Sequence, residues 1–227
     1  MNSAVKQNLE QIRSTIPAHV TLVAVSKFHP APSVREAYEA GQRVFGESKV
    51  QELTSKHEAL PSDIQWHFIG HLQTNKVKYI APFISMIHSV DSYRLLTEIN
   101  KNAEKNDRII DILLQVFIAS EETKFGFSPE ECSELLSVHP LTEWKNIRIR
   151  GLMGMATFTE DETQIRNEFR VLTHLFRKLK ETVFRDIPYF DQLSFGMSDD
   201  YQLAIEEGST MVRIGSSIFG NRNYQTN

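Results

Sequence analysis

The chain alternates between short apolar runs and longer segments in which apolar residues recur every three or four positions. The apolar runs are rich in Val, Ile, Leu and Phe, as buried parallel strands are. They cover residues 20–25, 43–46, 65–70, 84–90, 109–118, 147–155, 189–196 and 211–215. The pattern predicts eight strands with helices between them.

Helix signals stand between these runs. Residues 161–183 have apolar residues at spacings of three and four, which is typical of one buried helix face. Ser33 with Glu36, and Ser128 with Glu131, have the spacing of a capping box, in which side chain and backbone satisfy each other at a helix start. We therefore expect helices to begin after Ser33 and after Ser128.

Strands that alternate with helices pair in parallel and are joined by right-handed crossovers. Eight such units in 227 residues leave roughly 28 residues for each, close to the minimum for a βαβ unit. We predict an α/β fold, a single (β/α)8 TIM barrel over residues 1–227, with an extra N-terminal helix in residues 1–19 packed on the barrel. The alternative, a doubly wound open sheet, lacks its glycine-rich turn after the first strand.

Composition and charge restrict the partners. The net charge of -4 and dispersed basic residues provide no basic surface for nucleic acid or an anionic membrane. Cys132 is the only cysteine, so no intrachain disulfide is expected. The N-terminus does not resemble a signal peptide, and no apolar run reaches the length of a membrane span. We expect a cytoplasmic protein without a nucleic-acid or membrane partner.

Active sites of (β/α)8 barrels lie where the strands end, so the last residue of each run and the following loop are the candidates. The candidates at these ends are Lys27, Glu47, Ser48, His71, Met155, Ser194, Met197, Ser198, Arg213, Gly215 and Ser216. His67 and His71 are four residues apart, but a strand followed by a glycine turn does not have the helical geometry of paired metal ligands. No metal site is predicted.

The loops after the seventh and eighth strands, "SFGMS" and "RIGSS", are rich in glycine and serine. Each leads into a helical segment, so backbone N–H groups and hydroxyls gather where barrels of this class hold phosphate. Ser198 and Ser216 could each simply cap a helix. Two such loops on adjacent strands favour an anion site.

Closure of the barrel places the first strand beside the eighth, and so Lys27 beside this anion site. A desolvated lysine amine can form an imine with an aldehyde, which indicates a phosphorylated carbonyl compound. A phosphosugar aldolase and a pyridoxal 5′-phosphate site both fit, and a solvated lysine at a strand end is a third interpretation. Arg213 favours pyridoxal phosphate, because it could donate a hydrogen bond to the pyridine nitrogen. Arginine does not readily supply a proton, so carbanion chemistry would be weakly supported.

Motifs along nearly the whole chain resemble the YggS/PROSC family of pyridoxal phosphate homeostasis proteins, relatives of the N-terminal barrel of alanine racemase. The motifs are "VAVSK", "FGESKVQE", "WHFIGHLQTNK", "KFGF", "RGLMGMA" and "LSFGMSDDYQLAIEEGSTMVRIGSSIFG". Together they are specific, although each alone would be weak. The sequence departs from the family at Ser48, where asparagine is common, and at Phe195, where methionine is usual.

The resemblance implies a largely monomeric barrel that holds pyridoxal 5′-phosphate as a Schiff base on Lys27. It implies phosphate contacts from Ser198, Gly215 and Ser216, and places Arg213 near the pyridine nitrogen. The other expected cofactor contacts are Ser48, His71, Met155, Ser194 and Met197.

The resemblance leaves carrier and enzyme as alternatives. An alanine racemase needs a second acid-base group, a tyrosine that the family relation places in a β-rich domain across a dimer interface. Only "NRNYQTN" follows Gly220, so we do not expect that domain. The leading hypothesis is a carrier that buffers pyridoxal phosphate in vitamin B6 homeostasis and delivers it to apo-enzymes. The alternative is a pyridoxal phosphate-dependent amino-acid racemase of low efficiency.

Overall fold

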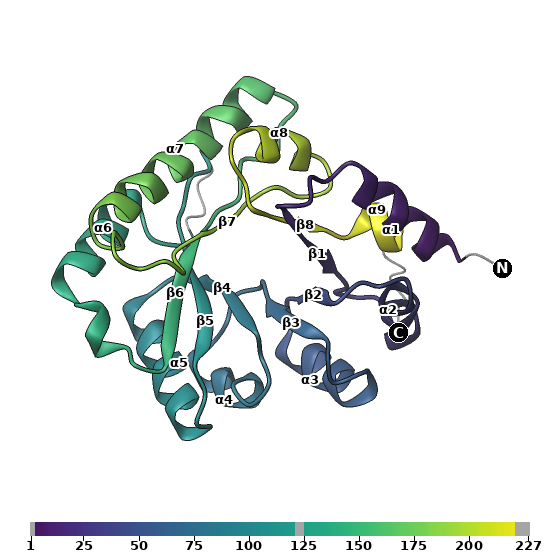
Figure 1. The fold of residues 1–227 in the computed structure, drawn as a ribbon, viewed down its shortest axis with the longest axis horizontal. Helices are drawn as coiled ribbons and strands as arrows, with labels where there is room; N and C mark the ends of the chain where they lie inside the picture. Colours follow the sequence, from purple (N-terminus) through teal and green to yellow (C-terminus); the bar gives the residue numbers. More distant parts are fainter. Residues whose placement is uncertain (1–2, 121–124, 221–227) are drawn as a thin grey trace.

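The computed structural model describes residues 3–120 and 125–220, and its strands close into a barrel (Figure 1). Each strand pairs in parallel with its neighbour in the sequence, and β8 pairs with β1. The strands are β1 (Thr21–Val25), β2 (Val44–Glu47), β3 (Gln65–Phe68), β4 (Met86–Val90), β5 (Ile110–Gln115), β6 (Ile147–Met153), β7 (Gln192–Ser194) and β8 (Met211–Ile214). The predicted eight-stranded α/β barrel is confirmed.

Helices surround the barrel (Figure 1). They are α1 (Ala4–Ser14), α2 (Ala31–Glu39), α3 (Val50–Ala59), α4 (Val77–Ile80), α5 (Tyr93–Lys105), α6 (Pro129–Val138), α7 (Glu162–Glu181), α8 (Tyr201–Glu206) and α9 (Ser216–Phe219), with 3-10 turns η1 (Thr74–Lys76) and η2 (Leu141–Glu143). Among these residues, none of the helices combines the length and the apolar character that crossing a membrane requires.

The extra N-terminal helix is present as α1, which lies against α9 and α2 (Figure 1). Leu9 is fully buried in this contact region, and the Asn8 side chain donates a hydrogen bond of 3.1 Å to the carbonyl of Ile218. Helix α1 therefore braces the short helix that follows β8, near the end of the barrel where the candidate residues lie.

One of the two predicted capping boxes is present. Ser128 and Glu131 form it at the start of α6, through a 3.1 Å bond from Glu131 N to Ser128 Oγ and a 2.7 Å bond from Ser128 N to Glu131 Oε2. The box predicted at Ser33 is wrong, because α2 already begins at Ala31. Proline stands in its first turn, where the missing N–H costs no helical hydrogen bond, so the helix can start before Ser33.

The apolar core has two layers. A small cluster of Val23, Met86, Leu113, Met153 and Met211 is buried together, one residue from each of five strands. A larger cluster fills the space between the strands and the helices. Helix α7 illustrates that second layer, because its apolar stripe is buried as its periodicity predicts.

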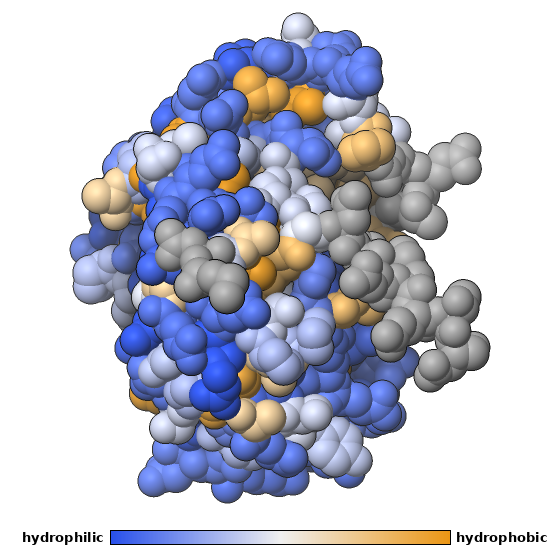
Figure 2. Space-filling model, turned by 90° about the vertical axis from the view of Figure 1, so that its right-hand side faces the viewer, coloured by the Kyte–Doolittle hydropathy of each residue, from blue (hydrophilic) through white to orange (hydrophobic). Residues whose placement is uncertain are grey.

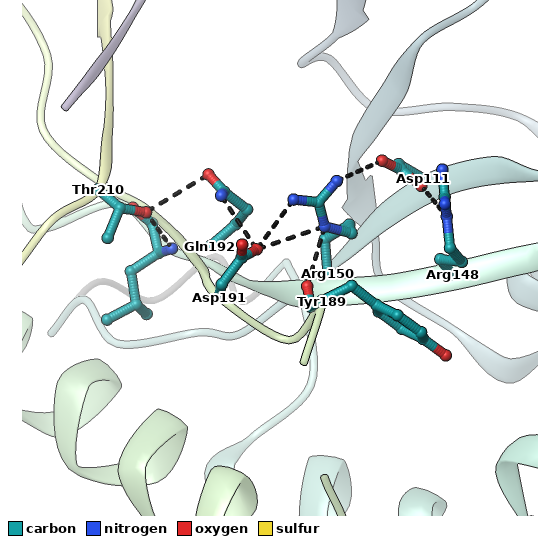
Figure 3. A network of polar contacts seen from close by, with 8 residues as sticks. Asp111, Arg148, Arg150, Tyr189, Asp191, Gln192 and Thr210 are labelled. Carbon is teal, nitrogen blue, oxygen red and sulfur yellow. Dashed lines mark hydrogen bonds and ion pairs between the residues drawn. The ribbon is translucent and has the colours of Figure 1, made fainter. Parts of the chain in front are cut away.

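Charged side chains connect the strands near the ends at which they begin, opposite the candidate site (Figure 3). Arg150 in β6 pairs with Asp111 in β5 at 2.7 Å and with Asp191, just before β7, at 2.9 Å. Arg148 approaches the other oxygen of Asp111 at 2.7 Å. This end of a barrel usually serves stability rather than chemistry, and the network fits that use.

The outer surface is mostly polar on the side of the molecule that carries α1 and α9. Figure 2 shows this face as largely hydrophilic, with apolar side chains gathered in separate small patches. Small patches of this kind are normal on a globular protein and do not by themselves indicate a binding surface.

Candidate functional site

A cavity of about 300 Å³ lies where β1 and β8 end. Its walls are formed by Val25, Lys27, His29, Ile69, Met155, Phe158, Met197, Ser198, Asp199, Arg213, Gly215, Ser216 and Gly220. The structure therefore brings seven predicted site residues to one cavity: Lys27, Met155, Met197, Ser198, Arg213, Gly215 and Ser216.

Lys27 reaches this cavity because β1 and β8 pair in register. Val23 lies beside Arg213 and Ala24 beside Ile214, so both strands end at the same level. Lys27 follows in the turn after β1 and is half-buried, whereas the next residue, Phe28, has a left-handed backbone with a φ of 67°. A bulky side chain rarely adopts that conformation, so neighbouring contacts must hold the turn in place.

The two serine-rich loops meet at the same cavity. Ser216 Oγ lies 3.1 Å from Ser198 Oγ, and the backbone N–H of Gly215 points to Ser198 Oγ at 3.4 Å. The two loops therefore bring two hydroxyls and the Gly215 N–H together at one side of the cavity. Anion binding by these groups stays a prediction.

Acidic residues also stand near these loops. Asp199 lines the cavity, and an Asp200 carboxyl oxygen accepts a 2.6 Å hydrogen bond from the Met197 N–H. Burial raises the pKa of Asp200 above its ordinary value, while the hydrogen bond from Met197 and the charge of Arg213 oppose that rise. Asp200 therefore holds the backbone of the loop between β7 and α8.

Arg213 forms the base of the cavity. It is buried, and its guanidinium donates to the Ser194 carbonyl at 2.8 Å, to Ser194 Oγ at 2.7 Å and to the Gly154 carbonyl at 3.1 Å. Burial lowers the pKa of Arg213 to about 10, and the charge of Asp200 opposes this effect. Arg213 is consequently protonated at neutral pH. With five N–H donors in a guanidinium, it retains donors for a ligand in the cavity that it lines.

A chain of buried hydrogen bonds continues below Arg213. Ser194 Oγ lies 3.0 Å from His88 Nδ1, and His88 Nε2 lies 2.9 Å from His67 Nδ1. Ser194 Oγ accepts from Arg213 and can also donate its own proton to His88 Nδ1. A neutral His88 then carries its proton on Nε2 and donates it to His67. In this arrangement each of the three hydrogen bonds has one donor and one acceptor.

His67 and His88, the two histidines joined by these hydrogen bonds, are neutral. Burial lowers the pKa of His67 to about 3 and holds the pKa of His88 well below its ordinary value, with the charges of His67 and Arg213 as further causes for His88. A neutral imidazole has one donor and one acceptor nitrogen, which suits the contacts of His88 with Ser194 and His67. In the described part of the chain, no three His, Cys, Asp or Glu residues form a group that could hold a metal ion.

Ser194 was predicted to contact the cofactor, but it lies beneath the cavity rather than on its wall. Its side chain is fully buried between Arg213 and His88. The position at the end of β7 is as expected, yet the side chain faces the barrel interior. Its hydroxyl contacts Arg213 and His88, and a contact between Ser194 and a ligand stays a prediction.

Ser48 and His71 do not line the Lys27 cavity either. They face a neighbouring groove of about 280 Å³ near the ends of β2 and β3. The Ser48 backbone lies against Gly70, and the mostly exposed His71 pairs with Asp91 at 3.2 Å. Ile69 occupies the adjacent part of the cavity wall. A contact between Ser48 or His71 and a ligand in the cavity therefore stays a prediction.

Some residues of the site were not found from the sequence. His88 is one, although a histidine inside the apolar run "ISMIHSV" is a signal that could have been used. Glu47 was placed at the end of a strand but given no role. His29, which stacks on Phe219 with ring centroids 5.1 Å apart, and the exposed Phe158 also line the cavity. Neither has a sequence pattern that marks it.

Known proteins match the chain over most of its length. The alanine racemase N-terminal domain family matches residues 2–223. A pyridoxal phosphate homeostasis protein of Aquifex aeolicus is 43% identical over 204 residues, which is 89% of this chain and 87% of the relative. The protein of the same name in Schizosaccharomyces pombe is 40% identical over 228 residues, 97% of this chain and 94% of the relative.

Solved structures show the same similarity at the level of the fold. PipY of Synechococcus elongatus, determined with pyridoxal phosphate bound, superposes with a TM-score of 0.85 at 34% identity and covers 95% of this chain and 100% of PipY. Alanine racemase of Streptomyces coelicolor shares the fold, with a TM-score of 0.76 at 18% identity, and 95% of this chain matches 57% of that enzyme. By its sequence and its fold, the chain belongs to the family of pyridoxal phosphate homeostasis proteins, built on the alanine racemase N-terminal domain.

Proposed function

We propose that this protein binds pyridoxal 5′-phosphate reversibly, with Lys27 as the covalent ligand, and serves in homeostasis of the cofactor. One observation carries the proposal: Lys27, the Ser198 and Ser216 hydroxyls and Arg213 line one cavity. Pyridoxal phosphate has an aldehyde, a phosphate and a ring nitrogen, and these residues offer one partner for each. The PipY structure with pyridoxal phosphate bound supports the same ligand.

The phosphate end of the cavity fits this ligand. The Ser216 hydroxyl lies 3.1 Å from Ser198 Oγ, and the Gly215 N–H lies 3.4 Å from the same oxygen. A Cβ at position 215 would lie 3.0 Å from the Val25 carbonyl oxygen, so a side chain there would crowd the end of β1. Glycine allows the two loops and β1 to approach closely around an anion.

Formation of the proposed imine between Lys27 and pyridoxal phosphate needs no reactant besides the two of them, and it releases one water molecule. The neutral Lys27 amine attacks the aldehyde carbon, a C=N bond replaces the C=O bond, and one water molecule leaves. Addition of water reverses the reaction and returns the aldehyde. The cavity admits that water, because Met155 and Phe158 at its wall are exposed at 42% and 87%. Reversible loading is the property that a carrier needs.

The chemistry of Arg213 favours a carrier over a catalyst. Bound pyridoxal phosphate can act as an electron sink, and it does so more strongly when its ring nitrogen is protonated. Arg213 would donate a hydrogen bond to that nitrogen but would keep its proton, since its pKa of about 10 is well above neutral. The ring nitrogen would stay unprotonated, so carbanion formation would be weakly supported.

The binding step is tested by adding pyridoxal phosphate to purified protein, recording the visible absorbance, and locating the borohydride-reduced adduct by peptide mass spectrometry. The adduct is expected on Lys27 and is expected to be absent in Lys27→Ala. Lys49→Ala is the matched control, because Lys49 contacts the ring of Phe28 at 4.8 Å but does not line the cavity. An adduct that persists in Lys27→Ala would contradict the assignment.

Delivery is tested by mixing the loaded protein with an apo-enzyme that requires pyridoxal phosphate, in the presence of a phosphatase that destroys the free cofactor. Activity of the recipient should recover with the wild type and remain absent with Lys27→Ala. In parallel, the loaded protein should interconvert D- and L-amino acids no faster than free cofactor does. Robust racemisation that depends on Lys27 would contradict the carrier function and favour an enzyme.

A further inference from the structure

A buried group of polar and charged side chains lies beside the turn that carries Lys27. It consists of Ser26, Glu47, Glu52 and Lys56, and is called the Lys56 cluster below. Lys56 in α3 and Glu47 at the end of β2 are almost fully buried, and the Glu52 side chain is 21% exposed. None of these four residues is on the wall of the Lys27 cavity. The cluster therefore contacts the turn from outside the ligand site.

Lys56 holds the residue before Lys27. Its ammonium donates to the Ser26 carbonyl at 2.7 Å, to Glu47 Oε1 at 2.6 Å and to Glu52 Oε1 at 2.8 Å. These three bonds use all the donors of an ammonium group. The Ser26 hydroxyl also donates to Glu47 Oε1, at 2.5 Å. Both the backbone and the side chain of Ser26 are thus fixed to the cluster.

Glu52 holds the residue after Lys27. Its Oε1 accepts a 2.7 Å hydrogen bond from the Phe28 N–H, and Phe28 is the residue with a φ of 67°. Left-handed backbone at a bulky residue persists only where surrounding contacts require it. The Glu52 carboxylate provides such a contact, and Lys56 in turn holds that carboxylate.

We propose that the Lys56 cluster positions Lys27: by fixing Ser26 and Phe28, Glu52 and Lys56 direct the Lys27 amine toward the phosphate-binding loops. This inference rests on the proposed function, because it concerns how well Lys27 meets a ligand whose phosphate is seated at Ser198 and Ser216. Reaction of an amine with an aldehyde held elsewhere by its phosphate depends steeply on such placement. The cluster residues act through Lys27 and do not themselves touch the ligand.

A purely stabilising role is a weaker explanation of the cluster. A buried ion pair adds little stability compared with well-packed apolar residues of similar volume. What distinguishes this ion pair is that both of its contacts to the main chain flank one residue, Lys27. Positioning and stability are separated by measuring the loading rate and the folded stability of the same variants.

The central variant is Glu52→Ala, which removes the acceptor of the Phe28 N–H. With cofactor-free protein, we expect the rate of covalent loading by pyridoxal phosphate to fall about tenfold or more, while competition by inorganic phosphate is unchanged. Adding Phe28→Gly should restore much of the rate, because glycine adopts a positive φ without strain. The matched control is Glu207→Gln, since Glu207 pairs with Arg166 and Arg170 outside the cavity.

A second readout needs no ligand. In cofactor-free protein, hydrogen exchange of the Phe28 amide should be faster in Glu52→Ala than in the wild type, and unchanged in Glu207→Gln. Should Glu52→Ala fail to fold, Lys56→Met removes the donor to the Ser26 carbonyl while keeping an unbranched side chain, and it should load slowly as well.

The outcomes separate the two proposals. Wild-type loading rates in Glu52→Ala or Lys56→Met, or unchanged Phe28 exchange, would overturn the positioning role and leave the proposed function intact. A control variant that slows loading as much as Glu52→Ala would show that the effect is one of general stability, and would also overturn it. Failure of the wild type to form an adduct on Lys27 would instead overturn the proposed function.

Discussion

At the residue scale, the Ser194 hydroxyl contacts two buried side chains beneath the Lys27 cavity. It accepts a hydrogen bond from Arg213 and lies 3.0 Å from His88 Nδ1, so it connects the guanidinium to the two buried histidines. The sequence placed Ser194 at the end of a strand near the ligand. In the structure its buried hydroxyl contacts Arg213, whereas the expected contact with a ligand stays a prediction.

Ser194→Ala should leave Arg213 and His88 each without one buried partner. Unsatisfied buried groups cost about 1–3 kcal/mol, so the free energy of unfolding should fall by that amount. Urea denaturation measures the change. The control is Ser137→Ala at an exposed position of α6, where the hydroxyl donates to the Glu134 carbonyl. Equal effects of the two substitutions would argue against the directed chain.

The double variant Ser198→Ala/Ser216→Ala removes two hydroxyls from the proposed phosphate site. A hydrogen bond to a charged group contributes about 1.5–3 kcal/mol, so the affinity for pyridoxal phosphate should fall by about tenfold or more. Pyridoxal, which lacks the phosphate, serves as the control ligand, and its affinity should not change. A titration that shows equal losses for both ligands would place the phosphate elsewhere.

At the scale of elements, the loop between β7 and α8 passes very close to α8 at Gly196. Gly196 has a φ of 96°, and a Cβ there would lie 2.5 Å from the Cβ of Ala204 in α8. No side chain can therefore be accommodated unless α8 moves away from the loop. Since Ser198 follows two residues later, the packing of α8 determines where the phosphate-binding hydroxyl lies.

Gly196→Ala should therefore disturb both stability and ligand binding. Gly208→Ala is its matched control, because Gly208 has a similar φ of 100° but its new Cβ would meet only Thr173, at 3.7 Å. The control should lose about 1–2 kcal/mol from backbone strain alone. Gly196→Ala should lose more and should also bind pyridoxal phosphate less tightly. Thermal unfolding and ligand titration check both points, and equal losses would show that backbone strain explains the whole effect.

For the molecule as a whole, the buried histidines connect stability to pH. Burial lowers the pKa of His67 from 6.5 to about 3, so the unfolded chain binds a proton in that range that the folded chain does not. His88 acts in the same direction. Stability should therefore fall as the pH decreases below about 6.5. Glu47 has the opposite effect on stability between about pH 4.5 and about pH 6. Burial raises the pKa of its carboxyl group to about 6 despite the charge of Lys56, so the folded chain binds a proton there that the unfolded chain does not.

Unfolding in urea between about pH 7 and about pH 5 measures this dependence. Each histidine contributes at most about 1.4 kcal/mol per pH unit. His67→Asn keeps an acceptor for His88 but cannot titrate, so its free energy of unfolding should depend less steeply on pH than that of the wild type. Identical slopes in the two proteins would show that the histidines are not the groups responsible.

The order of strands and helices could be predicted from the sequence alone, because buried strands and amphipathic helices have different apolar periods. The sequence alone also predicts that Lys27, Ser198 and Ser216 follow strand ends. Closure of an eight-stranded parallel barrel brings the first and last strands together, so this set could be assembled without coordinates.

The directions of the other side chains depend on how the helices pack around the barrel, which the sequence pattern does not show. Ser48 and His71 follow strand ends as expected, but their turns direct them to a neighbouring groove. The Lys56 cluster could not be foreseen, since Glu47 and Lys56 meet Ser26 only when α3 packs beside the ends of β1 and β2. The physical reason is that apolar periodicity specifies local structure, whereas the direction of a polar side chain depends on the packing of segments distant in the chain.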